Sequence, residues 1–318
     1  MSIELVLRAA AGDDAETLRG LLAANPDLTN AAGPHPHWVG RPSAIHVAAE
    51  WGSAAAIAVL AEFGADFNNP GTEYGDWSPI WLAANRRPGV ARLLMQHGAR
   101  LDACSAAGLG YIEELRAMLP EGARELGPDG ATPLHWASTA EIAALLLQNG
   151  ADPNAKTKSG NLPERSTARW PEVSRYLLGR ADRAPDIHLA AAIGDVERIR
   201  TMLAGRPSLI RAFSFRGDAA GAVEQGPPLH AAVYYGQIEA ARVLLEHGAK
   251  ITGVSRAGVP ALHCTAFRGE VAMAKFLVEN GADVNQIEPM HNATPLDWAR
   301  FQRQPALAEA LIALGARE

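Results

Sequence analysis

The chain has 318 residues, a formal net charge of -6 and a sequence pI near 5.9, and 48% of its residues are hydrophobic. It contains no lysine or arginine run, which excludes the basic footprint of a nucleic-acid-binding or anionic-membrane-binding protein. No stretch of about 18 apolar residues occurs, and Glu4 lies where a signal peptide would be apolar. We therefore expect a cytoplasmic protein with no nucleic-acid or membrane partner.

Cysteine and histidine spacing gives no metal site. Cys104 and Cys264 lie far apart, without a CxxC pair or a zinc-type Cys/His spacing, so we expect reduced, buried thiols. His35 and His37 form a His-x-His pair, but no further ligand lies at a suitable spacing, and a proline-held loop is the better interpretation. Walker, HExxH, GxSxG and GxGxxG motifs are absent, so no cofactor is expected.

Helix pairs follow one another along the whole chain. The first pair, 3–28, has no hairpin before it and is predicted to be an N-terminal cap. Six further pairs follow at 43–68, 78–100, 104–124, 132–154, 162–182 and 187–206, and three more occupy 228–316, the last serving as the C-terminal cap. Repeats five and six are each three residues short before their second helix, which predicts curtailed first helices there.

The clearest unit is 260–285, PALHCTAFRGEVAMAKFLVENGADVN. A short helix is cut at Gly269, and a second helix then carries apolar residues on one face at Val271, Ala274, Leu277 and Val278. Gly281 ends the second helix, because glycine reaches the left-handed conformation without strain. The spacing from Gly248 to Gly281 is 33 residues, and that from Gly281 to Gly315 is 34.

This period, with TPLH at 132–135, PLH at 228–230 and TPLD at 294–297, resembles the ankyrin repeat over nearly the whole chain. The resemblance implies an all-α solenoid of about ten helix pairs with hairpin loops, which forms one domain over 1–318. In this respect the chain is similar to bacterial proteins that consist of ankyrin repeats only. It also implies that the histidines at the TPLH position make a structural hydrogen bond between loops: His46, His135, His188, His230 and His263. Trp81, Trp136 and Trp298 lie at or beside that position and are interpreted as packing residues.

The connections between repeats differ in length. The helix-end glycine and the next TPLH position are normally 15 to 17 residues apart, but only 6 separate Gly98 from Cys104 and only 8 separate Arg180 from His188. Both spans are too short for a projecting hairpin, so we expect three blocks, 1–100, 101–183 and 184–318, with a change of curvature at each junction. The connections 25–44 and 206–228 are instead longer than usual, and we expect these two long loops to contribute to binding more than to folding.

The repeat register places two variable residues of each first helix on the concave face, where aromatic side chains are unexpectedly frequent. Such rings form an apolar surface that calls for a ligand or partner, unless the long loops cover them as a small core. The candidate binding residues on this face and in the long loops are Trp38, Arg41, Glu50, Trp51, Trp77, Arg86, Phe213, Phe215, Tyr234, Tyr235, Phe267, Arg268 and Phe301.

Two functions remain open on the sequence. The first, which we favour, is a monomeric interaction module that holds a protein or peptide partner in the concave groove. The alternative is a small-molecule site, with catalysis undecided, in an aromatic-lined pocket between the long loops and the groove. Its weak catalytic candidates are the carboxylates of Glu50 and Asp76 and the imidazole of His37.

Overall fold

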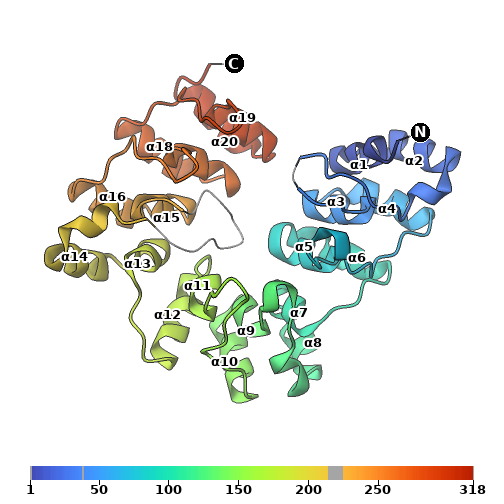
Figure 1. Cartoon of the computed structure of the whole chain (residues 1–318), viewed down its shortest axis with the longest axis horizontal. Coiled ribbons are helices and arrows are strands. Elements are labelled where there is room, and N and C mark those ends of the chain that lie inside the picture. The colour runs from blue at the N-terminus through green and yellow to red at the C-terminus, as the bar shows by residue number, and fades with distance from the viewer. Residues whose placement is uncertain (1, 38, 214–224, 318) are drawn as a thin grey trace. The chain divides into compact units, whose positions relative to one another are not determined.

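A computed structural model describes residues 2–37, 39–213 and 225–317, without the side chains of Thr72 and Arg86 (Figure 1). Within these ranges the regular structure is helical, with twenty α-helices, several short 3-10 turns and no β-strand. Two isolated bridges, Val254 to Pro260 and Glu288 to Ala293, close hairpin loops. The twenty helices form the ten predicted pairs.

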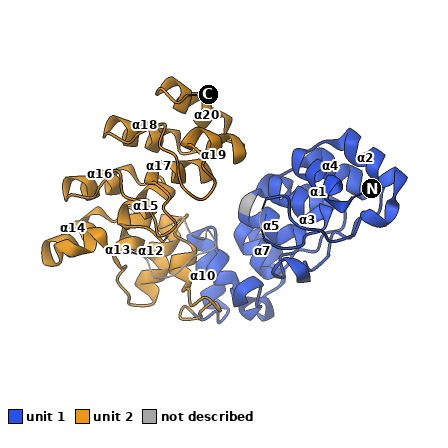
Figure 2. Cartoon of the chain, turned by 45° about the horizontal axis from the view of Figure 1, so that its top comes forward, with its two compact units in different colours: residues 1–152 blue, residues 153–318 orange. Residues whose placement is uncertain are grey.

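The chain divides into two compact units, Met1–Asp152 and Pro153–Glu318 (Figure 2). We call the first helix of each pair inner and the second outer. The five pairs of unit 1 are α1 (Ile3–Gly12) with α2 (Ala15–Ala24), α3 (Ala44–Trp51) with α4 (Ala54–Glu62), α5 (Pro79–Arg86) with α6 (Ala91–Gln96), α7 (Ala103–Leu109) with α8 (Ile112–Ala117), and α9 (Pro133–Trp136) with α10 (Ala140–Gln148).

Unit 2 contains α11 (Pro163–Ser166) with α12 (Pro171–Arg180), α13 (Ile187–Ile193) with α14 (Val196–Gly205), α15 (Pro228–Tyr234) with α16 (Ile238–Glu246), α17 (Ala261–Cys264) with α18 (Val271–Glu279), and α19 (Pro295–Phe301) with α20 (Pro305–Ala313). In each unit successive inner helices pack side by side, as α3 does on α5 and α15 on α17. The outer helices α2 and α4, and likewise α14 and α16, form a second layer.

Alanines allow the inner helices to approach one another closely. The pairs Ala48 with Ala49 and Ala190 with Ala191 are fully buried, and leucines of the outer helices such as Leu60 and Leu244 fill the space between the layers. Gly194, which ends α13, shows how tight the stacking is. Its φ of 69° is left-handed, and a Cβ there would lie 2.4 Å from Oε1 of Gln237 in the next repeat.

The inner helices of repeats five and six are shortened, as predicted. Helices α9 and α11 have four residues each, against eight in α3 and seven in α13. Helix α17 also has four residues, but its chain continues as a 3-10 turn, η8 (Thr265–Phe267), so repeat nine is not curtailed. Beyond α9, the hydroxyl of Ser138 donates to the carbonyl oxygen of Ala107 at 2.7 Å, which ties the shortened end to the preceding repeat.

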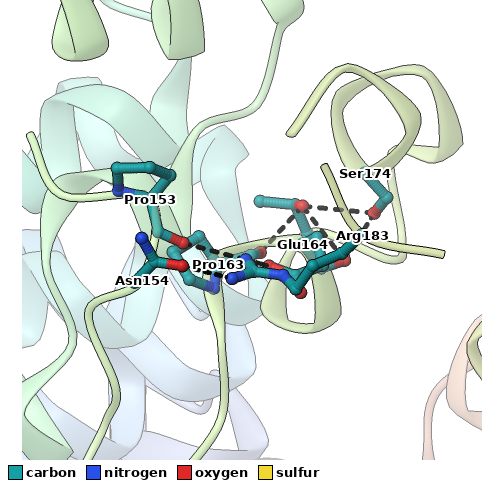
Figure 3. Close-up of polar contacts among 7 residues, drawn as sticks. Pro153, Asn154, Pro163, Glu164, Ser174 and Arg183 are labelled. Atoms are coloured by element: carbon teal, nitrogen blue, oxygen red, sulfur yellow. Dashed lines mark hydrogen bonds and ion pairs between the residues drawn. The ribbon is translucent and has the colours of Figure 1, made fainter. Parts of the chain in front are cut away.

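The short connection between repeats six and seven is held by one arginine (Figure 3). Arg183 Nη2 lies 2.8 Å from Glu164 Oε2, whose side chain is only 5% exposed, and it also donates to the carbonyl oxygen of Pro153 at 3.0 Å. Nη1 donates to Oδ1 of Asn154 at 2.5 Å. The backbone oxygen of Glu164 accepts from the hydroxyl of Ser174 at 2.7 Å. These contacts hold the connection that follows α12 against α11 and against the loop that precedes α11.

No helix in the described ranges is long and apolar enough to cross a membrane.

Candidate functional site

The TPLH histidines bridge neighbouring repeats, as the resemblance implied. Nε2 of His46, His230 and His263 lies 3.1 to 3.2 Å from a backbone oxygen of the next connection, that of Asn69, Val259 or Ala293. Nδ1 of His46 lies 2.8 Å from Oγ of Ser43, within the helix cap. Burial lowers the pKa of His46 and of His230 to about 4, because the uncharged ring is favoured there. These rings are structural at neutral pH.

The first long loop is anchored by His35 on the carboxylate of Glu50. His35 Nε2 lies 3.0 Å from Glu50 Oε2, and the hydroxyl of Tyr74 donates to the same oxygen at 2.8 Å. The backbone N–H of His37 donates to His35 Nδ1 at 3.0 Å, so this geometry places the ring proton of His35 on Nε2, facing the carboxylate. Both His35 and Glu50 are buried. His37, the weak catalytic candidate that the sequence named in this loop, is exposed.

Ring contacts complete the packing of this loop. His35 stacks on Tyr74 with ring centroids 5.5 Å apart, and the ring of His37 lies edge-on to Trp51 at 5.3 Å. Trp51 is therefore only 7% exposed, and the expectation that Glu50 and Trp51 face an open groove is not met. The loop covers them as a small core, which was the alternative that the sequence left open.

Arg41 is exposed and pairs with Glu73, Nε to Oε2, at 2.7 Å.

Of the remaining unit 1 candidates, Asp76 differs from Glu50 in its exposure. Asp76 is exposed in a left-handed turn with φ of 60°, whereas Glu50 is buried, so the two carboxylates do not share one environment. Trp38 lies outside the described residues, as does the side chain of Arg86.

Trp77 belongs to a packed tryptophan cluster with Trp81 and Trp136. The three ring centroids lie 5.0 to 6.2 Å apart in edge-to-face contacts, and only Trp77 is more than 8% exposed. Gly127 lies directly under this cluster, where a Cβ would be 2.0 Å from Cη2 of Trp81. The rings fill the space between repeats three and five, which supports the interpretation of Trp81 and Trp136 as packing residues.

In unit 2, four rings from successive inner helices form a continuous aromatic row. We define the aromatic row as Tyr235, Tyr234, Phe267 and Trp298, which come from α15 and its cap, η8 and α19. Successive centroids are 4.9, 5.7 and 5.3 Å apart. All four side chains are half-buried, and Phe301 nearby on α19 is 40% exposed. The sequence selected Tyr234, Tyr235, Phe267 and Phe301, but it assigned Trp298 to packing.

The sequence interpreted Trp298 as a packing residue, because it lies beside the TPLH position. Here its ring continues the row, while its Nε1 donates to Oε1 of Glu288 at 3.3 Å. Glu288 is fully buried and also accepts the backbone N–H groups of Met290 and His291 at 2.6 and 3.0 Å. This shapes the hairpin so that Ile287 and Met290 are 56% and 51% exposed.

Arg268 lies at the Tyr235 end of the aromatic row. Arg268 Cζ lies 5.9 Å from the ring centroid of Tyr235, and Arg268 Nε lies 3.3 Å from Oε1 of Glu270. Arg169 is half-buried with Cζ 4.0 Å from the Trp170 ring. Burial lowers the pKa of Arg169 to about 10, Tyr235 opposes that shift, and the nearby charge of Arg268 adds to it.

The other aromatic candidates of unit 2 lie in the second long loop. Phe213 is half-buried with Arg256 Cζ 5.9 Å from its ring centroid, and Phe215 lies outside the described residues.

Formal charge also differs between the two units. Residues 1–152 carry 9 lysine or arginine residues against 18 aspartate or glutamate residues, a net charge of -9. Residues 153–318 carry 20 against 17, a net charge of +3. The aromatic row therefore lies in the more cationic unit.

Models of known protein families agree with this architecture. Three family models match, described as ankyrin repeats (3 copies) at residues 6–105, ankyrin repeat at 129–158 and ankyrin repeats (many copies) at 229–278. A crystal structure of the human ASB11 ankyrin repeat domain is 22% identical, with a TM-score of 0.34, over 69% of this chain and 100% of that one. A search of curated proteins gave no match. The three matched regions together span more than half of the sequence, and the chain belongs to the ankyrin repeat family.

Proposed function

We propose that this chain is an interaction protein that holds a protein or peptide partner against the aromatic row of unit 2. Ankyrin repeats are generally protein-interaction modules, and the aromatic row is the observation that carries the specific proposal. Each ring of this size offers about 150 to 250 Å² of surface. Four half-buried rings in contact, with exposed Phe301 nearby, are the kind of anchors that dominate protein interfaces.

The rings of the row are held in place before any partner binds. Trp298 contacts Phe267 on one side and the ring of His263 on the other, with centroids 5.3 and 5.6 Å apart, and Glu288 holds its indole nitrogen. A rigid aromatic surface loses little conformational entropy on binding, so more of the contact energy appears as affinity. This supports the row as a binding surface.

The catalytic alternative receives no support from the geometry. A general acid or base must reach its substrate, but Glu50 is 3% exposed and its Oε2 already receives His35 and Tyr74. Because its contact with Glu50 is buried, the first long loop is packed against the rest of unit 1. We therefore assign partner binding to unit 2 and propose no reaction.

Selection from a phage-displayed library of random 12-residue peptides on the immobilised full chain tests this function. Fluorescence anisotropy then measures the enriched peptides on three variants. We expect Tyr234→Ala and Phe267→Ala each to weaken binding at least about tenfold, which is about 1.4 kcal/mol. The control is Tyr176→Ala, which removes a half-buried tyrosine of the outer helix α12. Equal affinity in all three variants, or no enrichment above the naive library, would remove the proposal.

A further inference from the structure

We infer that the partner segment held by the aromatic row is an acidic amphipathic α-helix, which lies along the row with a stripe of apolar side chains against the rings. Such a stripe consists of residues i, i+3 or i+4, and i+7, and it is one of the recurring ways in which proteins recognise peptides. This inference rests on the proposed function and names the conformation and chemistry of the partner.

The first observation is the spacing of the rings. Successive centroids in the row are 4.9, 5.7 and 5.3 Å apart. An α-helix rises about 5.4 Å per turn, so its apolar stripe presents one side chain in each such interval. Side chains on one face of a β-strand are about 6.6 Å apart, and a polyproline II helix repeats every 9.3 Å or about that. Of these three backbones, the helix fits the spacing of the row.

The second observation is that the row offers apolar contact at Phe267 and Trp298. The Phe267 side chain has no polar atom, and Nε1 of Trp298 donates to buried Glu288 at 3.3 Å. A helix makes its backbone hydrogen bonds internally, so it needs only apolar contact from such a surface. An extended segment would lay its N–H and C=O groups against the rings, where they lose water. This part of the row therefore favours a partner whose backbone is already hydrogen-bonded.

The third observation is that the apolar surface continues for the length of a short helix. Phe301 occupies in repeat ten the position that Tyr234 and Phe267 occupy in repeats eight and nine, four residues after the TPLH position. It is 40% exposed and follows Trp298 by three residues on α19, which places both side chains on neighbouring parts of the helix surface. A partner helix of about three turns therefore meets an aromatic ring at each turn.

The charge of unit 2 predicts the other faces of this helix. Residues 153–318 carry 20 lysine or arginine residues against 17 aspartate or glutamate residues, a net charge of +3. Complementary potentials favour acidic over basic residues on the faces of the bound helix that do not contact the rings. The partner is thus a helix with an apolar stripe and acidic flanks.

Double-mutant cycles between the row and a bound peptide test this conformation. The probes are the 12-residue peptides that phage selection enriches on the full chain, and fluorescence anisotropy measures their affinity. Each apolar peptide residue is replaced by alanine, and each peptide is measured on the wild type, Tyr234→Ala and Trp298→Ala. These two rings are two centroid spacings apart, so the residues that couple to them are about seven apart in a helical peptide and about three apart in an extended one.

We expect a coupling of at least about threefold in affinity between Tyr234 and one peptide residue, and between Trp298 and a second residue seven positions away. The control is Tyr176→Ala on the outer helix α12, which should couple to no peptide residue.

A second measurement needs only the wild-type chain. A peptide residue outside the apolar stripe is replaced in turn by alanine and by glycine. The glycine form should bind about fivefold more weakly, because glycine disfavours a helix by about 1 kcal/mol relative to alanine. The same exchange at the last residue of the peptide should change the affinity little, because helix ends fray.

The two hypotheses fail in different ways. Peptides that lose affinity with Phe267→Ala, but whose coupled residues lie three apart or whose alanine and glycine forms bind equally, would overturn the helix and leave the binding surface intact. Enrichment of lysine and arginine outside the stripe would overturn the acidic flanks. Peptides that are insensitive to Tyr234→Ala and Phe267→Ala would place the binding elsewhere and remove both hypotheses.

Discussion

The indole N–H of Trp81 donates a hydrogen bond of 2.5 Å to Oδ2 of Asp102, the residue that caps the N-terminus of helix α7. Trp81 occupies the TPLH histidine position of repeat three. In repeats with a hairpin, the histidine at that position reaches a backbone oxygen of the next connection. The hairpin is missing before α7, and a longer side chain reaches the helix cap itself.

The second junction without a hairpin uses the same arrangement with different residues. Arg165 at the TPLH position of repeat six pairs through Nη2 with Oδ2 of Asp186, the N-cap of α13. The two partners are 21 residues apart in both cases. A short connection in this chain is therefore accompanied by a long donor before it and an aspartate cap after it.

Asp102→Ala tests the importance of the first junction. The change removes the cap on the backbone N–H of Ser105, at 2.7 Å, and leaves the buried Trp81 indole without this acceptor. We expect a loss of about 2 to 4 kcal/mol. The control Asp14→Ala removes only the exposed cap of α2 and should cost about 1 kcal/mol. Urea unfolding followed by circular dichroism measures both, and equal losses would show that the indole contact is unimportant.

Arg183→Met tests the contacts at the second junction. It leaves the carboxylate of Glu164, which is 5% exposed, without its cationic partner, and we expect a loss of about 3 to 5 kcal/mol. Arg19→Met breaks an ion pair with Glu62 in which both side chains are about half exposed, and it should cost less than about 1 kcal/mol. The same unfolding measurement compares the two variants. If they are equally stable, Arg183 does not hold the junction.

His35→Ala separates the folding role of the first long loop from a binding role. The change removes the ring that contacts Oε2 of buried Glu50, so we expect a loss of about 2 to 4 kcal/mol. His37→Ala removes an exposed ring and should cost about 1 kcal/mol or less. Thermal melts of both variants give the comparison. A mild effect of His35→Ala would return the loop to the binding role expected from the sequence.

The free energy of unfolding should decrease as the pH is lowered, because of the buried histidines. The folded-state pKa of His46 and of His230 is about 4, below the unfolded value of about 6.5, so the unfolded state takes up protons first as the pH falls. The stability that these rings contribute is complete above pH 6.5 and is lost between pH 6.5 and 4, at about 3 kcal/mol for each ring. Urea midpoints at pH 7.5, 6 and 5 measure the loss. His230→Gln should flatten the profile over this window, and an unchanged slope would contradict the assignment.

The period and the helix-end glycines were sufficient to predict the ten helix pairs and the short α9 and α11, because repeat register is a local property of sequence. Register also placed Tyr234 and Phe267 at equivalent positions of neighbouring repeats, and their ring centroids lie 5.7 Å apart in the structure. It did not predict that Glu50 is buried. That depends on how 30–42 folds back onto α3, and loop conformation has no period. The contact of Trp298 with Glu288 and those of Arg183 with Glu164, Pro153 and Asn154 were not predicted, because they too depend on how the connections fold.

Gly127 shows that a single repeat of this chain cannot be exchanged independently of the others. A side chain at that position would collide with Cη2 of Trp81, so the connection before repeat five is fitted to a tryptophan two repeats earlier. A consensus repeat grafted into the fifth position would need glycine there, or histidine in place of Trp81. The latter change would remove the donor to Asp102. Substitutions at three distant positions are therefore linked, and a repeat from another array can be exchanged into this chain only together with them.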